Sequence, residues 1–201
     1  MHPWRKPVKN KKVQGDYHMN ILYHHINVWR GRQIDKWVHY FPIYEKHFER
    51  FVNRSPRVLE IGIDHGGSLQ MWARYFGPGA EIIGVDVNPA AMFSEEQITT
   101  HVFDQTDPKI ADLGPFDVII DDGSHRTRDQ AESFVNLFPV CRGVYLNEDC
   151  HTEYPHLPGA SQLMYRYPWV IVVEQPRRII RGEPTRVLRE DEAAARKLFG
   201  P

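Results

Sequence analysis

Short apolar runs alternate with glycine-rich or amphipathic segments along most of the chain, and this alternation limits the possible folds more than any other feature. The clearest runs cover residues 57–62, 81–86 and 116–121, and each is followed by residues typical of a loop or a helix. Strands that are apolar on both faces are typical of a parallel sheet covered by helices on both sides. We therefore predict an α/β, doubly wound, mostly parallel seven-stranded sheet with an antiparallel edge.

The remaining elements follow from the same patterns. Apolar residues recur at three-to-four spacing after Pro42, which suits the first turn of a helix. Further helices are expected at 68–76, 127–138 and 191–199, and further strands at 100–103, 143–146, 169–174 and 178–180.

Length and composition favour one globular domain. The 201 residues suffice for one substantial core. We expect a flexible basic tail at 1–16 and a single domain at 17–201, in which residues 17–53 form an aromatic-rich helical lead-in or cap.

The charge and hydropathy patterns argue against a nucleic-acid or membrane partner. The net charge is -1, which argues against nucleic acid as a partner and favours a small molecule. No stretch approaches the roughly 20 apolar residues that a membrane span needs, so no membrane partner and a cytoplasmic location are predicted. Two cysteines, Cys141 and Cys150, fit reduced thiols better than a disulfide scaffold.

The loop after the first strand predicts a ligand site at the carboxyl end of the sheet. Its sequence, Glu60-Ile-Gly-Ile-Asp-His-Gly-Gly-Ser68, has Asp64 where a dinucleotide fingerprint has its second glycine. Asp86 ends the second strand and can accept hydrogen bonds from two ribose hydroxyls. Glu60 suits an amino-acid moiety better than a phosphate.

Acidic residues follow two later strands. Asp121, Asp122 and His125 end one apolar run, and Glu148 and Asp149 end the next. Because parallel strands bring their carboxyl ends together, Asp122, Glu148 and Asp149 are expected to converge. An oxygen-rich site of this kind suits Mg²⁺, with Mn²⁺ as another candidate.

These motifs together resemble class I S-adenosylmethionine-dependent methyltransferases, and in particular the metal-dependent sugar O-methyltransferases related to macrolide-sugar methylating enzymes. The resemblance spans roughly residues 35–154 and rests on Val-Leu-Glu-Ile-Gly, Gly-Val-Asp, Ile-Ile-Asp-Asp-Gly-Ser-His, Tyr-Leu-Asn-Glu-Asp-Cys-His and Ile-Asp-Lys-Trp-Val-His-Tyr. It implies a Rossmann-like methyltransferase fold, S-adenosylmethionine as cofactor and a saccharide or other small-molecule acceptor. Self-association into a homo-oligomer is an expectation from the same source.

The resemblance also assigns roles to residues. It implies that Glu60, Gly62 and Ser68 line the methionine part of the cofactor, that Asp86 holds the ribose, and that Asp104 and Gln105 border the adenine. Asp121 is expected among the cofactor-binding residues, and Asp122, Glu148 and Asp149 as metal ligands. His125, with Asp122, is expected to be catalytic: a hydroxyl is too weakly acidic to attack a sulfonium methyl group unless a base takes its proton and a Lewis acid stabilises its oxygen.

Two other functions remain open on the sequence alone. The sheet and Asp86 also permit an NAD-dependent oxidoreductase. The basic N-terminus permits a cofactor-binding or nucleic-acid-binding module without chemistry.

Overall fold

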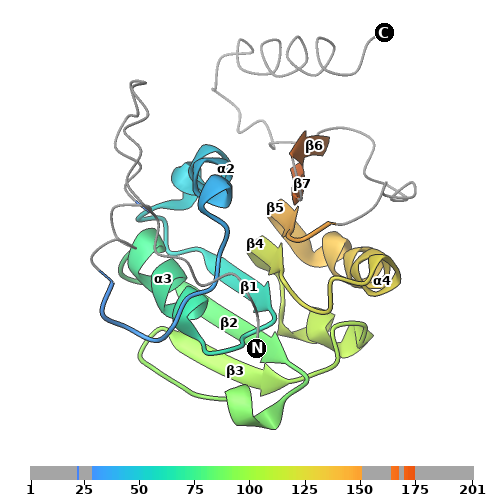
Figure 1. Ribbon diagram of the computed structural model, residues 1–201, viewed down its shortest axis with the longest axis horizontal. Helices are drawn as coiled ribbons and strands as arrows, with labels where there is room; N and C mark the ends of the chain where they lie inside the picture. Colours follow the sequence, from blue (N-terminus) through green and yellow to red (C-terminus); the bar gives the residue numbers. More distant parts are fainter. Residues whose placement is uncertain (1–21, 23–28, 151–163, 168–169, 175–201) are drawn as a thin grey trace, which may run out of the picture.

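The computed structural model describes residues 22, 29–150, 164–167 and 170–174 (Figure 1). Its helices are η1 (Val38–Tyr40), α2 (Phe41–Phe48), η2 (Glu49–Phe51), α3 (Gly67–Phe76), η3 (Pro89–Ala91), η4 (Pro108–Leu113), α4 (Thr127–Leu137) and η5 (Phe138–Val140). Its strands are β1 (Arg57–Ile61), β2 (Glu81–Asp86), β3 (Ile98–Val102), β4 (Phe116–Asp121), β5 (Cys141–Asn147), β6 (Met164–Tyr167) and β7 (Val170–Glu174).

The strands form one seven-stranded sheet in the order β3-β2-β1-β4-β5-β7-β6. Strands β1 to β5 pair in parallel with their neighbours, whereas β7 is antiparallel to both β5 and β6. The predicted fold class, including the antiparallel edge, is therefore confirmed. The strand order reverses between β1 and β4, which is where open α/β sheets bind ligands.

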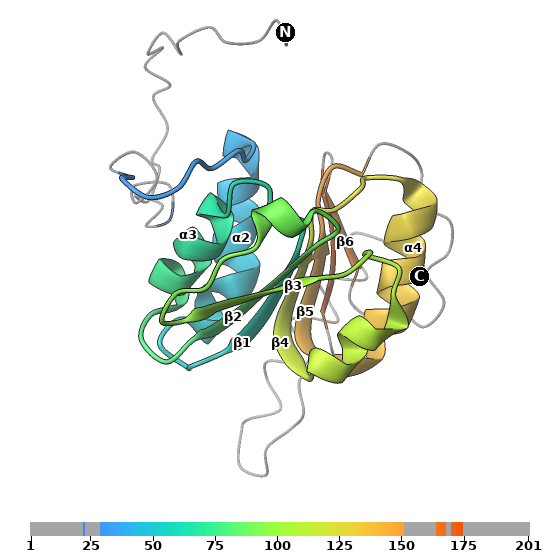
Figure 2. The same ribbon diagram turned by 90° about the horizontal axis from the view of Figure 1, so that it is seen from below.

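Helices cover both faces of the sheet (Figure 2). On one face, α2 and α3 pack over alternate strand residues, with Tyr44, Phe48 and Trp72 fully buried between the layers. The Trp72 ring meets Tyr44 edge-on, with 5.0 Å between ring centroids. On the other face, α4 buries Phe134 against Tyr145 of β5. Because both faces are covered, the central strands are apolar on both sides.

The sequence-based boundaries hold closely for some elements and fail for others. Strands 81–86 and 116–121 have the predicted bounds, whereas β3 begins two residues earlier than the expected 100–103. Strand β6 was missed altogether. The strand predicted at 178–180, the helix at 191–199 and the basic tail at 1–16 lie outside the described residues, as does most of the lead-in before Trp29.

The thiol of Cys141, at the start of β5, should be unreactive in the folded protein. Burial raises its pKa to about 12, against an opposing contribution from the backbone N–H of Gly143. This folded-state pKa lies above the value of about 8.5 for a free thiol. The protonated Cys141 thiol therefore contributes its full share of stability below about pH 8.5, and that share is lost as the pH rises toward 12. At pH 8 we expect iodoacetamide to modify Cys141 far more slowly than the half-buried Cys150, and both at similar rates in denaturant. Equal rates in the native protein would contradict this.

Candidate active site

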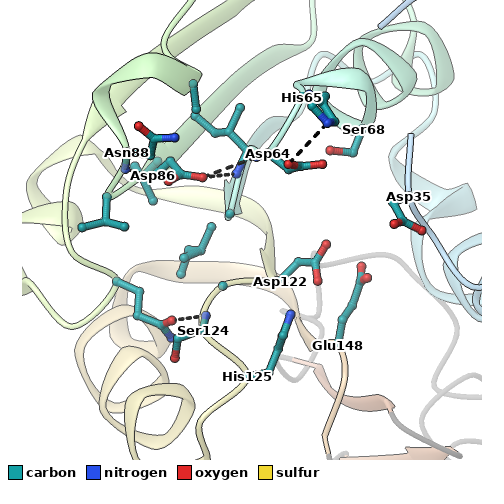
Figure 3. Close-up of a pocket in the computed structure, with 18 of the residues that line it drawn as sticks. Asp35, Asp64, His65, Ser68, Asp86, Asn88, Asp122, Ser124, His125 and Glu148 are labelled. Atoms are coloured by element: carbon teal, nitrogen blue, oxygen red, sulfur yellow. Dashed lines mark hydrogen bonds and ion pairs between the residues drawn. The ribbon is translucent and has the colours of Figure 1, made fainter. Parts of the chain in front are cut away.

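A cavity of about 820 Å³ lies beyond the carboxyl ends of β1, β2, β4 and β5. Figure 3 shows Asp86 and Asn88 at one end of this cavity and Asp122, His125 and Glu148 gathered at the other. Its walls are formed by segments 33–37, 61–68, 85–91, 103–105, 122–125 and 148–149, with some gaps, and by Asp129. Polar side chains from six separate segments therefore surround one hollow at the topological switch point of the sheet.

The glycine loop brings backbone close to the cavity. Gly62 has φ 90°, a left-handed conformation, and its N–H donates to the Val85 carbonyl at 2.8 Å. A Cβ atom at Gly62 would overlap the carbonyl oxygen of Asp122, so only glycine fits. Asp86 fixes the following turn, because its Oδ2 accepts from the Ile63 N–H at 2.8 Å. Residues 61–65 of this loop line the cavity, so its backbone can approach a bound ligand closely.

Gly62→Ala is expected to destabilise the protein and weaken cofactor binding. A left-handed conformation costs a non-glycine residue roughly 1–3 kcal/mol, before any displacement of the β4 loop that carries Asp122. The melting temperature and the affinity for S-adenosylhomocysteine, measured by calorimetry, should both fall. The exposed Gly79, which has φ 85°, is a matched control, because Gly79→Ala carries similar strain far from the cavity. Equal losses of cofactor affinity in the two variants would contradict this account of Gly62.

Most of the residues predicted to bind the cofactor line the cavity. Gly62, Ser68, Asp86, Asp104 and Gln105 all do so. Asp104 holds its own turn, with Oδ1 accepting from the Thr106 N–H and hydroxyl at 2.9 and 2.7 Å, and these bonds lower its pKa. Gln105 is buried and joins two loops, since its Oε1 accepts from the Ser124 N–H and its Nε2 donates to Ser133.

Two of the predicted cofactor residues lie elsewhere. Glu60 is fully buried behind the cavity wall, and burial raises the pKa of its carboxyl although Lys36 opposes this. Asp121 is the last residue of β4, and its carboxylate accepts from the hydroxyl of Tyr145, which belongs to the core cluster on the α4 side of the sheet. Burial raises the pKa of Asp121 to about 7, opposed by the Gly123 N–H and the Tyr145 hydroxyl. Neither side chain lines the cavity, so direct contact between either one and the cofactor finds no support in this geometry.

The three predicted metal ligands converge at one end of the cavity. Asp122 directly follows β4, and Glu148 and Asp149 directly follow β5. Two adjacent residues of a strand cannot face the same side, but Asp149 has φ 50°, a left-handed conformation, so the chain turns after the strand. The Glu148 N–H donates to the Asp121 carbonyl at 2.9 Å, which ties the two strand ends together.

A lysine that the sequence analysis did not single out lies among these acids. Lys36 Nζ contacts Asp122 Oδ2 at 2.5 Å, Glu148 Oε2 at 3.0 Å and Glu60 Oε1 at 3.1 Å. Burial alone would lower the pKa of Lys36, but Asp122, Glu148 and Glu60 more than offset this and raise it well above its ordinary value. Its only signal in the sequence was its place in the Ile-Asp-Lys-Trp motif.

Two tyrosines of the lead-in donate hydrogen bonds to the acids. The Tyr44 hydroxyl donates to Glu148 Oε1 at 2.7 Å, and the Tyr40 hydroxyl donates to Asp149 Oδ1 at 2.5 Å. Burial, with the neighbouring carboxylates, raises the pKa of both phenols, so both remain donors. Both rings are fully buried, so these tyrosines position the acids.

His125 and two of the acids can share a cation. One ligand atom from each of Asp122, His125 and Asp149 lies within 4.8 Å of the others, and His125 Nε2 is 3.8 Å from Asp149 Oδ2. His125 Nδ1 is buried without a hydrogen-bond partner among the described residues. Carboxylate oxygens with one imidazole are donors that a hard or borderline divalent ion accepts, so these residues fit such an ion.

The strand order, the glycine loop at the switch point and the cavity resemble those of solved class I S-adenosylmethionine-dependent methyltransferases. Within that class, the chain is similar to sugar O-methyltransferases of macrolide and tetracenomycin pathways, and the predicted resemblance is confirmed.

The similarity is clearest in three comparisons. The chain is 44% identical over 144 residues to demethylmacrocin O-methyltransferase of Streptomyces fradiae, and this alignment covers 63% of this chain and 36% of that protein. It is 40% identical over 133 residues to mycinamicin VI 2''-O-methyltransferase of Micromonospora griseorubida, an alignment that covers 59% of this chain and 33% of that protein. The structure of MycE methyltransferase in complex with Mg, SAH and mycinamycin VI matches with a TM-score of 0.62 and 31% identity, over 75% of this chain and 53% of that one.

The chain thus spans about a third of the length of the curated relatives it matches. No protein-family model matches it. Among the helices of the described residues, none has the length and apolar character to cross a membrane.

Proposed function

We propose that this protein transfers a methyl group from S-adenosylmethionine to a hydroxyl of a sugar, oligosaccharide or glycosylated natural product, with the help of a divalent cation. One observation carries the proposal: Asp122, His125, Glu148 and Asp149, from two neighbouring strand ends, meet at one end of a cavity whose other end holds the glycine loop and Asp86. The names of relatives support it, since two of them describe O-methylation of a rhamnosyl tetracenomycin-C.

The cofactor would occupy the end of the cavity at β1 and β2. We assign the methionine part to Gly62 and Ser68, the ribose to Asp86, and the adenine to the side of Asp104 and Gln105, all of which line the cavity. Asp86 Oδ1 accepts from the Asn88 N–H at 2.8 Å, so its carboxylate is held in a fixed orientation before a ribose binds. Methyl transfer from a sulfonium ion needs mainly such positioning.

The acids would hold a divalent cation, for which Mg²⁺ is our first assignment. Asp122 and Asp149 can each offer a carboxylate oxygen toward the cavity, and Glu148 lies beside them. Such an ion supplies positive charge that makes a neighbouring hydroxyl more acidic. Tyr40 and Tyr44 fix the orientation of the acids, as partners behind metal ligands commonly do.

His125 would take the proton of the acceptor hydroxyl. Its ring lines the cavity beside Asp122, and its Nε2 faces the carboxylate of Asp149 at 3.8 Å. An imidazole in this position can accept the proton at Nε2 while Asp149 stabilises the charged ring.

The proposal is tested by methyl transfer from labelled S-adenosylmethionine to a panel of free sugars and glycosides. We expect transfer to at least one glycoside, loss of transfer in excess chelator, and recovery when Mg²⁺ or Mn²⁺ is restored. Transfer that survives complete removal of divalent ions would reject the metal role. Tight binding of NAD without binding of S-adenosylhomocysteine would instead favour an oxidoreductase. Self-association stays a prediction that sedimentation analysis can test.

A further inference from the structure

The strongest unexplained feature of the site is the position of Lys36. The lysine comes from the extended segment before η1, more than 80 positions away from Asp122 in the sequence, yet its ammonium lies among acids from three strand ends. Only 2% of its side chain is exposed. A buried ammonium is costly unless it is paired, and here it contacts Glu60, Asp122 and Glu148.

These contacts leave part of the acidic cluster free for another cation. Lys36 takes Oδ2 of Asp122, and both oxygens of Glu148 face it at 3.1 and 3.0 Å. Asp122, His125 and Asp149 form the group that can share an ion, and Asp149 lies on the Tyr40 side without a contact to Lys36 among the described residues. Asp122 is therefore shared by an inner position that the ammonium fills and an outer position that faces the cavity.

The ammonium also joins the lead-in to the sheet. The neighbours of Lys36 in sequence line the cavity: Gln33, Ile34, Asp35 and Trp37. Lys36 therefore holds one wall of the site against the strand ends. In the described residues, every ion pair of Glu60, Asp122 and Glu148 is made with Lys36. Removing it would leave three neighbouring carboxyl groups without a cation.

We propose that Lys36 is a positioning residue that acts as a resident cation of the metal site. It holds Asp122 and Glu148 together when the divalent ion is absent, and it stays in the inner position when that ion binds beside it. This inference rests on the proposed function only in its second part, because the first part concerns the metal-free protein.

The first test is the stability of charge variants in excess chelator. Lys36→Met keeps the length of the side chain and removes its charge, so the melting temperature should fall by roughly 6–20 °C. Adding Glu60→Gln removes one of the unpaired acids and should restore about half of that loss or more. Lys109→Met, at an exposed lysine of η4, is the matched control and should change little. A Lys36→Met variant as stable as the control, or no recovery in the double variant, would overturn the proposal.

The second test asks whether Lys36 stays in place when metal binds. In the wild-type protein, acetic anhydride should acetylate Lys109 readily and Lys36 very slowly, both in chelator and in saturating Mn²⁺. Faster modification of Lys36 in Mn²⁺ would show that the ion displaces it and would overturn the proposal. In calorimetry, the Lys36→Met variant should bind Mn²⁺ about tenfold more tightly than wild type, because a nearby positive charge has been removed. Unchanged affinity would count against a resident cation. If the wild type binds no Mn²⁺ at all, the metal role under the proposed function fails, whereas the stability test in chelator still decides the role of Lys36.

Discussion

Asp122→Asn is expected to lower kcat/KM for methyl transfer by about a thousandfold or more. Asp122 is the acid shared by Lys36 and by the group that can hold a cation, and a neutral amide cannot supply the same charge. Loss of metal-assisted stabilisation of a few kcal/mol corresponds to a change of this size. Steady-state kinetics at saturating Mg²⁺, with Mn²⁺ affinity measured in parallel, checks the prediction.

The matched control for this variant is Asp112→Asn. Asp112 is exposed on η4, away from the cavity, and its loss of charge should leave the rate within about twofold of wild type. The account of Asp122 fails if its variant retains normal Mn²⁺ affinity and normal turnover. Circular dichroism of both variants separates a loss of function from a loss of folding.

His125→Ala is expected to lower kcat by about 10²–10⁴, the range typical of losing a general base. We also expect added imidazole to restore part of the activity, because a small base can diffuse into the space that the ring vacates. Mn²⁺ affinity should fall much less than in Asp122→Asn if His125 moves a proton and does not ligate the ion.

His101→Ala provides the comparison, because His101 is a half-buried histidine of β3 that does not line the cavity. Neither its rate nor its response to imidazole should differ from those of wild type. A His125→Ala variant that loses Mn²⁺ binding as completely as Asp122→Asn, and is not rescued by imidazole, would make His125 a metal ligand and remove it as the base.

The parallel core of the fold could be predicted because its strands are apolar on both faces. Strands β2 and β4 are buried runs bounded by turn residues, so composition alone marks their ends. Strand β6 was missed because Met164–Tyr167 mixes aromatic, basic and apolar residues and carries no such run. An edge strand has only one neighbour, so its sequence is less constrained.

The acidic part of the site could be predicted because parallel strands align their carboxyl ends. That rule brought Asp122 and Glu148 together across a gap of 26 positions in the sequence. Lys36 could not be found in this way, since it lies on a segment without regular structure whose path depends on tertiary packing. Asp121 shows the opposite kind of error, because the motif predicted a cofactor contact for it. Its carboxylate instead accepts a hydrogen bond from the Tyr145 hydroxyl and does not line the cavity.

The most direct test is the position of Mn²⁺ in crystals grown with S-adenosylhomocysteine, located by anomalous diffraction. We predict one strong peak bounded by Asp122 and Asp149, beside His125 and Glu148 and within the same cavity as the cofactor. A peak elsewhere, or no peak at a Mn²⁺ concentration that supports full activity, would contradict it.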